Sequence, residues 1–463
     1  MKNHLKINIS LIILDIKIYL IIKKSDIMSR RDIAWYEDRK LKSLYIKASS
    51  NAMRNYHAPI VSPKTTFTGT NSLTDFINHL GSFLSAEDKR VLLVVDKDLP
   101  KFGEKVAERL KSLKQIDSRI FLNVLPEVPK YTVIEAVEVC KEYDPKAIIA
   151  IGGGSAMDTA KLILLFYERP EINLNNLMAP SYLGLRKKVY ILAAIPTTSG
   201  TGSETTFIAV VTDTDREPPK KTEVVLYELC PDFVVLNTDF VKTMPPYLTM
   251  GTGMDALAHS MGSYVLTMST EYTDINNLKA IQMILDYLPR AVKRGNDIEA
   301  RSKMQLGAYI AGIGFGNVSG GIEHGLGHSF GALFHAHHGV CVGMYLCISI
   351  AYQSKVTNRF IDLAKVFKIR TEDKQRDEIL KELLEKLITF MKLVGCPLSI
   401  SELEKPKVSR EEYMNKMDQM VDYAFNDYTT LSSTRKLDPP TIRWMYEIAY
   451  ENKLDDLMEL FYK

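Results

Sequence analysis

Ala147-Ile-Ile-Ala-Ile-Gly-Gly-Gly-Ser155 joins a short apolar run to a glycine turn, and the chain continues to Lys161 as a predicted helix. The aliphatic run 147–151 is typical of a strand that is buried on both faces. Three successive glycines remove every Cβ from the turn, so backbone N–H groups can approach an anion, and the helix N-terminus adds partial positive charge. The stretch therefore predicts an α/β sheet with a phosphate-binding corner, although a tight structural turn would have the same sequence.

The same alternation of strand and helix extends in both directions, from about residue 68 to residue 236. Further strands are predicted at 91–95, 120–125 and 189–195, and helices at 102–113, 132–143 and 156–167. This order is the pattern of an α/β layer with a largely parallel sheet.

After about Pro246 the strand runs stop and helical periodicity continues to the end of the chain. The clearest helix is 376–394, followed by Gly395 as a stop signal. Helices are also predicted at 273–288 and 411–423. We expect three parts: an N-terminal extension (1–52), an α/β nucleotide-binding domain (53–245) and a helical domain (246–463).

Composition limits the possible partners. The 463 residues are 46% hydrophobic, and 59 Lys and Arg against 56 Asp and Glu leave a net charge of +3 without a long block of one sign. A nucleic-acid surface is therefore not expected. The cysteine count is odd, at five, and includes no C-x-x-C pair. This argues against a disulfide framework and favours a reducing, cytoplasmic setting.

The N-terminal run 7–22 is rich in Ile and Leu and has two interpretations. Asp15 and Lys17 interrupt the run, it is shorter than the roughly 20 apolar residues that span a bilayer, and no small-residue cleavage site follows it. We therefore expect no stable membrane insertion. Residues 1–27 are interpreted as an extended start or a loose tail, with Met28 as the better start; a weak membrane anchor is the alternative.

The window 251–339 holds six of the nine histidines. Asp255 and His259 are four residues apart, so a helix would place both on one face, and His324 and His328 repeat that spacing. Three more candidates follow at His335, His337 and His338. A carboxylate with two or three imidazoles suits Fe(II) or Zn(II) in a catalytic site better than in a structural one.

Two further features fit a nucleotide site. The loop Pro196-Thr-Thr-Ser-Gly-Thr-Gly-Ser-Glu204 is dense in small hydroxyl side chains and glycine, and Asp96 follows the strand 91–95. A carboxylate at the carboxyl end of a parallel strand can accept both ribose hydroxyls and would repel a 2′-phosphate, which favours NAD over NADP. Each feature alone could be an ordinary turn or helix cap. The arrangement is not a G-x-G-x-x-G fingerprint, because Met157 takes the place of the third glycine.

Taken together, these motifs closely resemble the iron-containing (group III) alcohol dehydrogenases, from about Pro63 to the C-terminus. The resemblance rests on five motifs in one order: 152–161, 196–204, 253–259, 324–331 and 338–340. It implies the dehydroquinate synthase-like fold, in which an α/β domain binds NAD(P) and an all-helical domain binds a divalent metal in the cleft between them. The activity implied is reversible hydride transfer between a small alcohol and its aldehyde or ketone. Dimers are common among such enzymes, so a homodimer is expected.

The resemblance also assigns roles to single residues. The implied metal ligands are Asp255, His259, His324 and His338. His328 matches the histidine near the nicotinamide and substrate, and we expect it to relay the proton, so that the catalytic residues are His328, Asp255 and His324. The implied cofactor contacts are Asp96, Gly153, Gly154, Ser155, Asp158, Thr197, Thr198 and Lys221. His335 and His337 have no counterpart role.

The sequence departs from the family pattern at a few positions. Many members carry Glu where this chain has Gly262 and Asp where it has Asn237, and the stretch 427–435 matches only loosely. No departure removes a ligand, so they bear on substrate preference. Two rival functions are metal-dependent lyase or cyclase chemistry of the dehydroquinate synthase type with transient use of NAD, and a non-enzymatic or filament-forming role with a vestigial site.

Overall fold

The structure is a computed structural model that describes residues 59–174, 182–215 and 220–463. The predictions for the N-terminal extension 1–52, including a start at Met28, lie outside the described residues.

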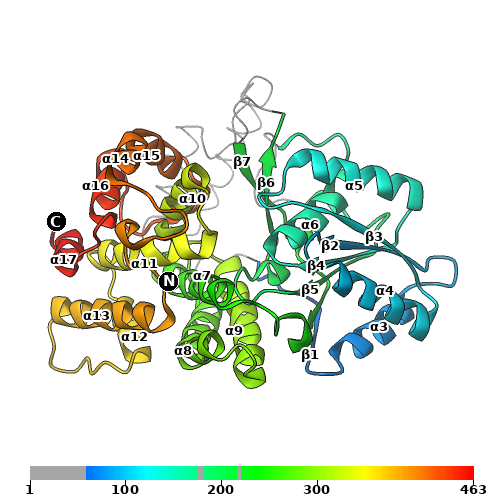
Figure 1. Ribbon diagram of the computed structural model, residues 1–463, viewed down its shortest axis with the longest axis horizontal. Helices are drawn as coiled ribbons and strands as arrows, with labels where there is room; N and C mark the ends of the chain where they lie inside the picture. Colours follow the sequence, from blue (N-terminus) through cyan, green and yellow to red (C-terminus); the bar gives the residue numbers. More distant parts are fainter. Residues whose placement is uncertain (1–58, 175–181, 216–219) are drawn as a thin grey trace, which may run out of the picture.

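A six-stranded parallel sheet forms the core of the first half of the described chain (Figure 1). Its strands follow the order β1-β8-β5-β4-β2-β3 across the sheet. Their bounds are β1 Thr65–Thr68, β2 Arg90–Asp96, β3 Asp117–Val124, β4 Ala147–Gly152, β5 Ile191–Pro196 and β8 Phe233–Leu236. The largely parallel sheet that the sequence predicts is confirmed.

Helices cover both faces of this sheet, as Figure 1 shows for α5 and α6 on one side and α3 and α4 on the other. Their bounds are α3 Ser72–Phe83, α4 Pro100–Lys114, α5 Lys130–Tyr143 and α6 Gly154–Glu168. Along β2, Leu92 and Val94 pack in the cluster that includes α5 and α6, whereas Val91, Leu93 and Val95 pack in the cluster that includes α3 and α4. Burial on both faces explains why the central strands are continuously aliphatic.

An antiparallel pair, β6 (Ile208–Asp213) and β7 (Lys220–Val225), forms a separate two-stranded sheet. The sequence pattern did not indicate this hairpin. It alternates buried and partly exposed residues along β6, which is the pattern of a strand with one covered face.

The second half is helical. Its bounds are α7 Pro246–Tyr264, α8 Glu271–Lys293, α9 Ile298–Gly316, α10 Ile322–Phe334, α11 His338–Ser354, α12 Phe360–Val366, α13 Arg376–Val394, α14 Arg410–Asn415, α15 Met417–Phe425, α16 Pro439–Ala449 and α17 Leu454–Tyr462. Helix α13 has the predicted bounds, and Gly395 caps it in the left-handed conformation. The single helix predicted at 411–423 is wrong: Lys416, at φ −95° and ψ 4°, separates α14 from α15.

The loop between β5 and β6 packs directly on two helices of the helical half. A Cβ on Gly200 would lie 2.5 Å from the backbone oxygen of Thr252 in α7, and a Cβ on Gly202 would lie 2.6 Å from Cα of Gly312 in α9. Glycine is needed here because two backbones approach each other closely. We propose that the two domains divide at residues 245 and 246, between the end of β8 and the start of α7.

Within the described ranges, none of the helices combines the length and apolarity needed to cross a membrane.

Candidate functional site

Helix α7 presents Asp255 and His259 on one face, as their four-residue spacing predicts. Both side chains are buried, and Nε2 of His259 lies 3.7 Å from Oδ1 of Asp255. The ring of His259 stacks on Phe315 of α9, with centroids 3.8 Å apart and an interplanar angle of 4°. This stacking fixes the plane of the imidazole.

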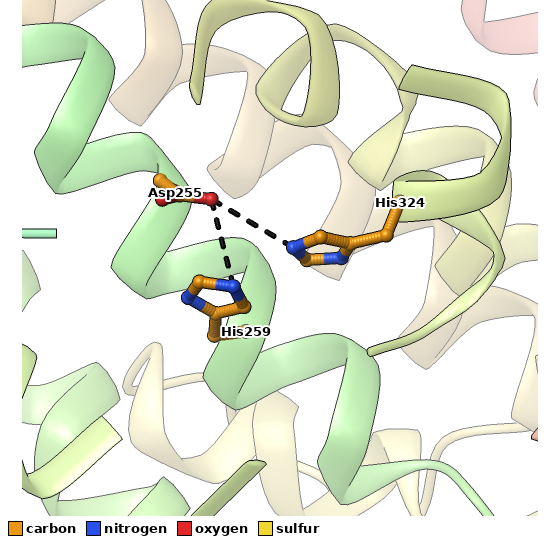
Figure 2. Close-up of side chains that lie close together, drawn as sticks. All are labelled: Asp255, His259 and His324. Carbon is orange, nitrogen blue, oxygen red and sulfur yellow. Dashed lines mark ion pairs between the residues drawn. The ribbon is translucent and has the colours of Figure 1, made fainter. Parts of the chain in front are cut away.

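Two further histidines approach the same carboxylate oxygen from α10 and α11. Nε2 of His324 lies 3.7 Å from Oδ1 of Asp255, and Nε2 of His338 lies 3.3 Å from it. Figure 2 shows Asp255, His259 and His324 converging from neighbouring helices. The His338 side chain is 42% exposed, whereas the other three are nearly covered, so the group is open on the His338 side.

Among the described residues, several polar atoms in this cluster have no hydrogen-bond partner, including Oδ1 of Asp255, Nε2 of His324 and Nδ1 of His259. Burying a polar atom without a partner is costly, and each such group in a native structure needs an explanation. Ligand atoms of Asp255, His259 and His324 all lie within 4.8 Å of one another. One carboxylate and several imidazoles are a donor set that fits Fe(II) or Zn(II).

Burial and charge set the protonation of the cluster. Burial lowers the pKa of His259 to about 3, which keeps this imidazole neutral. Burial would raise the pKa of Asp255, but the surrounding imidazoles hold it well below its usual value. Burial also acts to lower the pKa of His324, but the carboxylates of Asp255 and Glu323 outweigh it and raise that pKa to about 9. The two carboxylates thus favour a positive charge at this place, as the raised pKa of His324 shows.

His328 lies next to the cluster and has a carboxylate partner. Its Nδ1 is 2.8 Å from Oδ2 of Asp427, and the ring stacks with that of His338 at a centroid distance of 5.2 Å. Oδ1 of Asp427 accepts hydrogen bonds from the backbone and hydroxyl of Thr429. Glu223 of β7 brings a further carboxylate within 4.8 Å of the His328 and Asp427 ligand atoms. The hairpin β6–β7 therefore reaches the helical half at this point.

The predicted phosphate corner lies at the carboxyl ends of β4 and β5. Gly153 is the N-cap of α6, and Gly153 and Gly154 face the side chains of Thr198 and Thr201 at distances that leave little room for a Cβ. Thr197 donates its backbone N–H to the oxygen of Gly152. The glycine turn and the loop 196–204 therefore form one packed unit beside the first turn of α6, which includes Ser155.

Asp96 ends β2 and lies beside Gly152, because β2 and β4 are adjacent parallel strands with Val95 opposite Ile151. A Cβ on Gly152 would lie 3.2 Å from Cβ of Asp96. The carboxylate is partly exposed, and Oδ1 accepts the N–H of Asp98. The structure thus brings Asp96 to the same sheet edge as the glycine turn, where open α/β sheets bind ligands.

Asp158 and Lys221 each have partners within the protein. The oxygens of Asp158 accept hydrogen bonds from Ser203 and from the backbone of Val210, so this carboxylate supports the loop that follows β5. Lys221 of β7 forms an ion pair with Glu127. Direct cofactor contact by these two side chains stays a prediction.

His335 and His337 lie at the junction of α10 and α11. His335 is exposed and caps α10 in the left-handed conformation, at φ 54°, whereas His337 is the N-cap of α11 and packs against Gly251. Neither is among the residues that approach Oδ1 of Asp255 within 4.0 Å in the described chain.

Two carboxylates of the site had no role assigned from the sequence: Glu323, which contacts His324, and Asp427, which contacts His328. Glu323 directly precedes the candidate ligand His324 in the sequence, and this adjacency could have indicated its role. Asp427 is 99 residues from its partner, and no local pattern indicates the pair.

Comparison with known proteins gives a consistent result across the chain. The model of the iron-containing alcohol dehydrogenases matches residues 63–238, and the model of the C-terminal part of the Fe-containing alcohol dehydrogenase family matches residues 249–450. An NADPH-dependent butanol dehydrogenase of Clostridium saccharobutylicum is 32% identical over 393 residues, which cover 84% of this chain and 97% of that protein. An NAD-dependent methanol dehydrogenase of Bacillus methanolicus is 32% identical over 353 residues, covering 75% and 88%.

Among solved structures, an alcohol dehydrogenase from Oenococcus oeni matches with a TM-score of 0.77 at 26% identity. The match covers 85% of this chain and 100% of that one.

Proposed function

The chain belongs to the iron-containing alcohol dehydrogenase family and is a metal-dependent alcohol oxidoreductase, and from this premise we propose the roles of its residues. Reversible hydride transfer would occur between NAD and a small alcohol or its aldehyde or ketone. The observation that carries the proposal is the buried Oδ1 of Asp255, which has no hydrogen-bond partner in the part of the chain that the structure describes and faces Nε2 of three histidines.

We propose Asp255, His259, His324 and His338 as the metal ligands, with Fe(II) as the ion and Zn(II) as the alternative. A bound divalent ion supplies Lewis acidity, which polarises the alcohol oxygen and lowers the pKa of its proton. The open side at His338 leaves room for the substrate oxygen, as a catalytic site requires.

His328 is proposed to hold and transfer the substrate proton. Burial lowers its pKa despite the neighbouring Asp427, so the ring is neutral. If Nδ1 donates its hydrogen to Asp427, the lone pair of Nε2 is free to accept the proton of the alcohol. Asp427 thereby sets the tautomer that His328 needs in order to act as a base.

NAD is proposed as the cofactor, with NADP less favoured. The two relatives named above differ in this respect, one being NADPH-dependent and the other NAD-dependent, so the choice depends on local residues. A carboxylate at Asp96 can accept ribose hydroxyls and repels a 2′-phosphate. Gly153, Gly154 and Ser155 would face the pyrophosphate at the start of α6, where the helix dipole favours an anion.

A reducing, cytoplasmic location and a homodimer are also proposed. All five cysteines are free and buried. Burial raises the pKa of Cys140, Cys230, Cys341 and Cys347 to about 12, so these thiols are held in their unreactive form. A test of assembly is the molar mass in solution measured by light scattering.

The test of function is NADH formation by protein purified without oxygen, stripped with a chelator and reloaded with Fe(II) or Zn(II). A panel of short alcohols is expected to give turnover that depends on added metal. His324→Asn should abolish metal-dependent turnover, whereas His335→Asn removes an exposed imidazole and should leave it unchanged, because Asn tolerates the left-handed conformation at that position.

Bound NAD without net NADH release from any alcohol would overturn the dehydrogenase proposal and favour the lyase chemistry. Full activity of His324→Asn after chelation would overturn the ligand assignment.

A further inference from the structure

Glu323 is a fully buried carboxylate at the start of α10, directly before the proposed ligand His324. Its Oε1 lies 3.0 Å from Nδ1 of His324 and accepts the backbone N–H of Gly321, also at 3.0 Å. Its Oε2 accepts the hydroxyl of Ser349 in α11 at 2.6 Å. All three neighbours can donate, so both oxygens of the ionised carboxylate are satisfied.

The space for this carboxylate comes from a glycine on α7. A Cβ on Gly262 would lie 2.1 Å from Oε1 of Glu323, which is far closer than two such atoms can approach. Gly262 lies three residues after His259, on the helix that carries Asp255. The carboxylate of Glu323 therefore fills the place that a side chain at position 262 would occupy.

We propose that Glu323 is a positioning residue for the metal centre, and this inference rests on the proposed function. The carboxylate accepts a hydrogen bond from Nδ1–H of His324, and this fixes the ring tautomer in which Nε2 carries the lone pair. Nε2 is the atom that faces Asp255. A carboxylate behind a ligating imidazole holds the ring in orientation and increases its basicity.

The charges of the site support this role. A divalent ion held by one carboxylate and three neutral imidazoles has a net charge of +1. Glu323 adds a second buried negative charge beside the ligands and brings the total to zero. Because an uncompensated charge is costly away from water, Glu323 should stabilise the metal-loaded state more than the metal-free state.

The test is the affinity of metal-free protein for Zn(II), measured by calorimetric titration for wild type and Glu323→Gln. The substitution keeps the shape and removes the charge. We expect 10- to 100-fold weaker binding, the range for such carboxylates behind a metal-bound histidine. The rise in Tm on adding Zn(II) should shrink in parallel. Glu385→Gln, at an exposed position of α13, removes the same charge and should change neither quantity.

A rescue experiment separates positioning from general structural support. Glu323→Ala removes the carboxylate and opens the space above Gly262. Adding Gly262→Asp to Glu323→Ala restores a carboxylate from α7. The Cβ of this aspartate would stand next to the place that Oε1 of Glu323 occupies in the wild type, and its carboxylate oxygens lie two bonds beyond that Cβ. The double variant should bind Zn(II) more tightly than Glu323→Ala alone.

Wild-type affinity in Glu323→Gln would overturn the role of Glu323 and leave the metal centre intact. A folded double variant that binds no better than Glu323→Ala would also overturn it. Failure of the wild-type protein to bind Zn(II) or Fe(II) would overturn the metal centre itself, and the inference with it.

Discussion

Nδ1 of His328 lies 2.8 Å from Oδ2 of Asp427, although the two residues are 99 positions apart in the chain. Burial would raise the pKa of Asp427, but His328 and Thr429 lower it, so the carboxylate is ionised. An ionised carboxylate can only accept hydrogen bonds, so Nδ1 is the nitrogen of His328 that carries the hydrogen. The pair gives the imidazole one orientation and one tautomer.

Asp427→Asn should therefore slow catalysis more than it weakens binding. The amide can donate to Nδ1 and stabilise the wrong tautomer, so we expect kcat to fall on the order of 100-fold, the low end of the range that a positioned proton acceptor contributes. Steady-state kinetics with a short alcohol measure this. Asp422→Asn, at an exposed position of the preceding helix, is the matched control and should leave kcat unchanged. Equal loss in both variants would contradict the role.

Metal removal should destabilise the protein, because an ion that binds only the folded state stabilises it by mass action. At a free ion concentration 100 times the dissociation constant, the gain is about 2.7 kcal/mol. Urea unfolding before and after chelation, and after adding Fe(II) or Zn(II) back, tests this. His259→Asn should lose most of the response. If the urea midpoint of the wild-type protein does not change when metal is removed or added back, the result would count against the metal site.

Gly312→Ala should destabilise the protein despite the higher helix propensity of alanine. A Cβ at Gly312 would lie 2.2 Å from the hydroxyl of Thr205 and 2.7 Å from the backbone oxygen of Gly202. Forcing the α9 backbone away from this loop should cost about 1–3 kcal/mol. Gly307→Ala is the control on the same helix, because its Cβ would meet Met283 at an ordinary 3.5 Å. Urea unfolding should show a loss for the first variant and none for the second.

Glu204→Gln should stabilise the protein at high pH and have little effect at low pH. Burial raises the pKa of Glu204 to about 7 from an ordinary value of 4.5. Between these values the folded state holds a proton that the unfolded state has lost, so wild-type stability falls as pH rises through this window. Glu204→Gln lacks this penalty, so its free energy of unfolding should exceed that of the wild type by roughly 3 kcal/mol above pH 7.

Unfolding of metal-free wild type and Glu204→Gln at pH 5 and pH 8 measures the difference. Glu104→Gln, at an exposed position in α4, is the control, and its stability should differ from that of the wild type by the same amount at pH 5 and at pH 8. A Glu204→Gln effect that is as large at pH 5 as at pH 8 would contradict the assignment.

The fold followed from local patterns wherever one pattern dominated. Helix α13 has a continuous apolar face and a glycine cap, and its bounds were predicted to the residue. The segment 410–425 has helical periodicity too, yet Lys416 leaves the helical conformation within it. The hairpin β6–β7 was missed because its strands mix charged and apolar residues and lack the continuous aliphatic run of β4 and β5.

Helical spacing indicated the pair Asp255 and His259, whereas the choice of His324 and His338 from the other histidines of the window came from the family resemblance. Glu323 was not assigned a role although it directly precedes His324, and Asp427 was not assigned one because a contact across 99 positions leaves no periodic trace in the sequence. Phe315, which stacks on His259 from α9, was likewise not assigned a role. The side chains that face Asp255 were thus indicated by spacing and resemblance, whereas the residues that orient them were not assigned.

All four side chains that face one another around Asp255 belong to α7, α10 and α11, whereas the glycine turn and Asp96 belong to the sheet half. Replacing residues of the sheet half should therefore change the proposed nucleotide contacts without removing any of these four side chains.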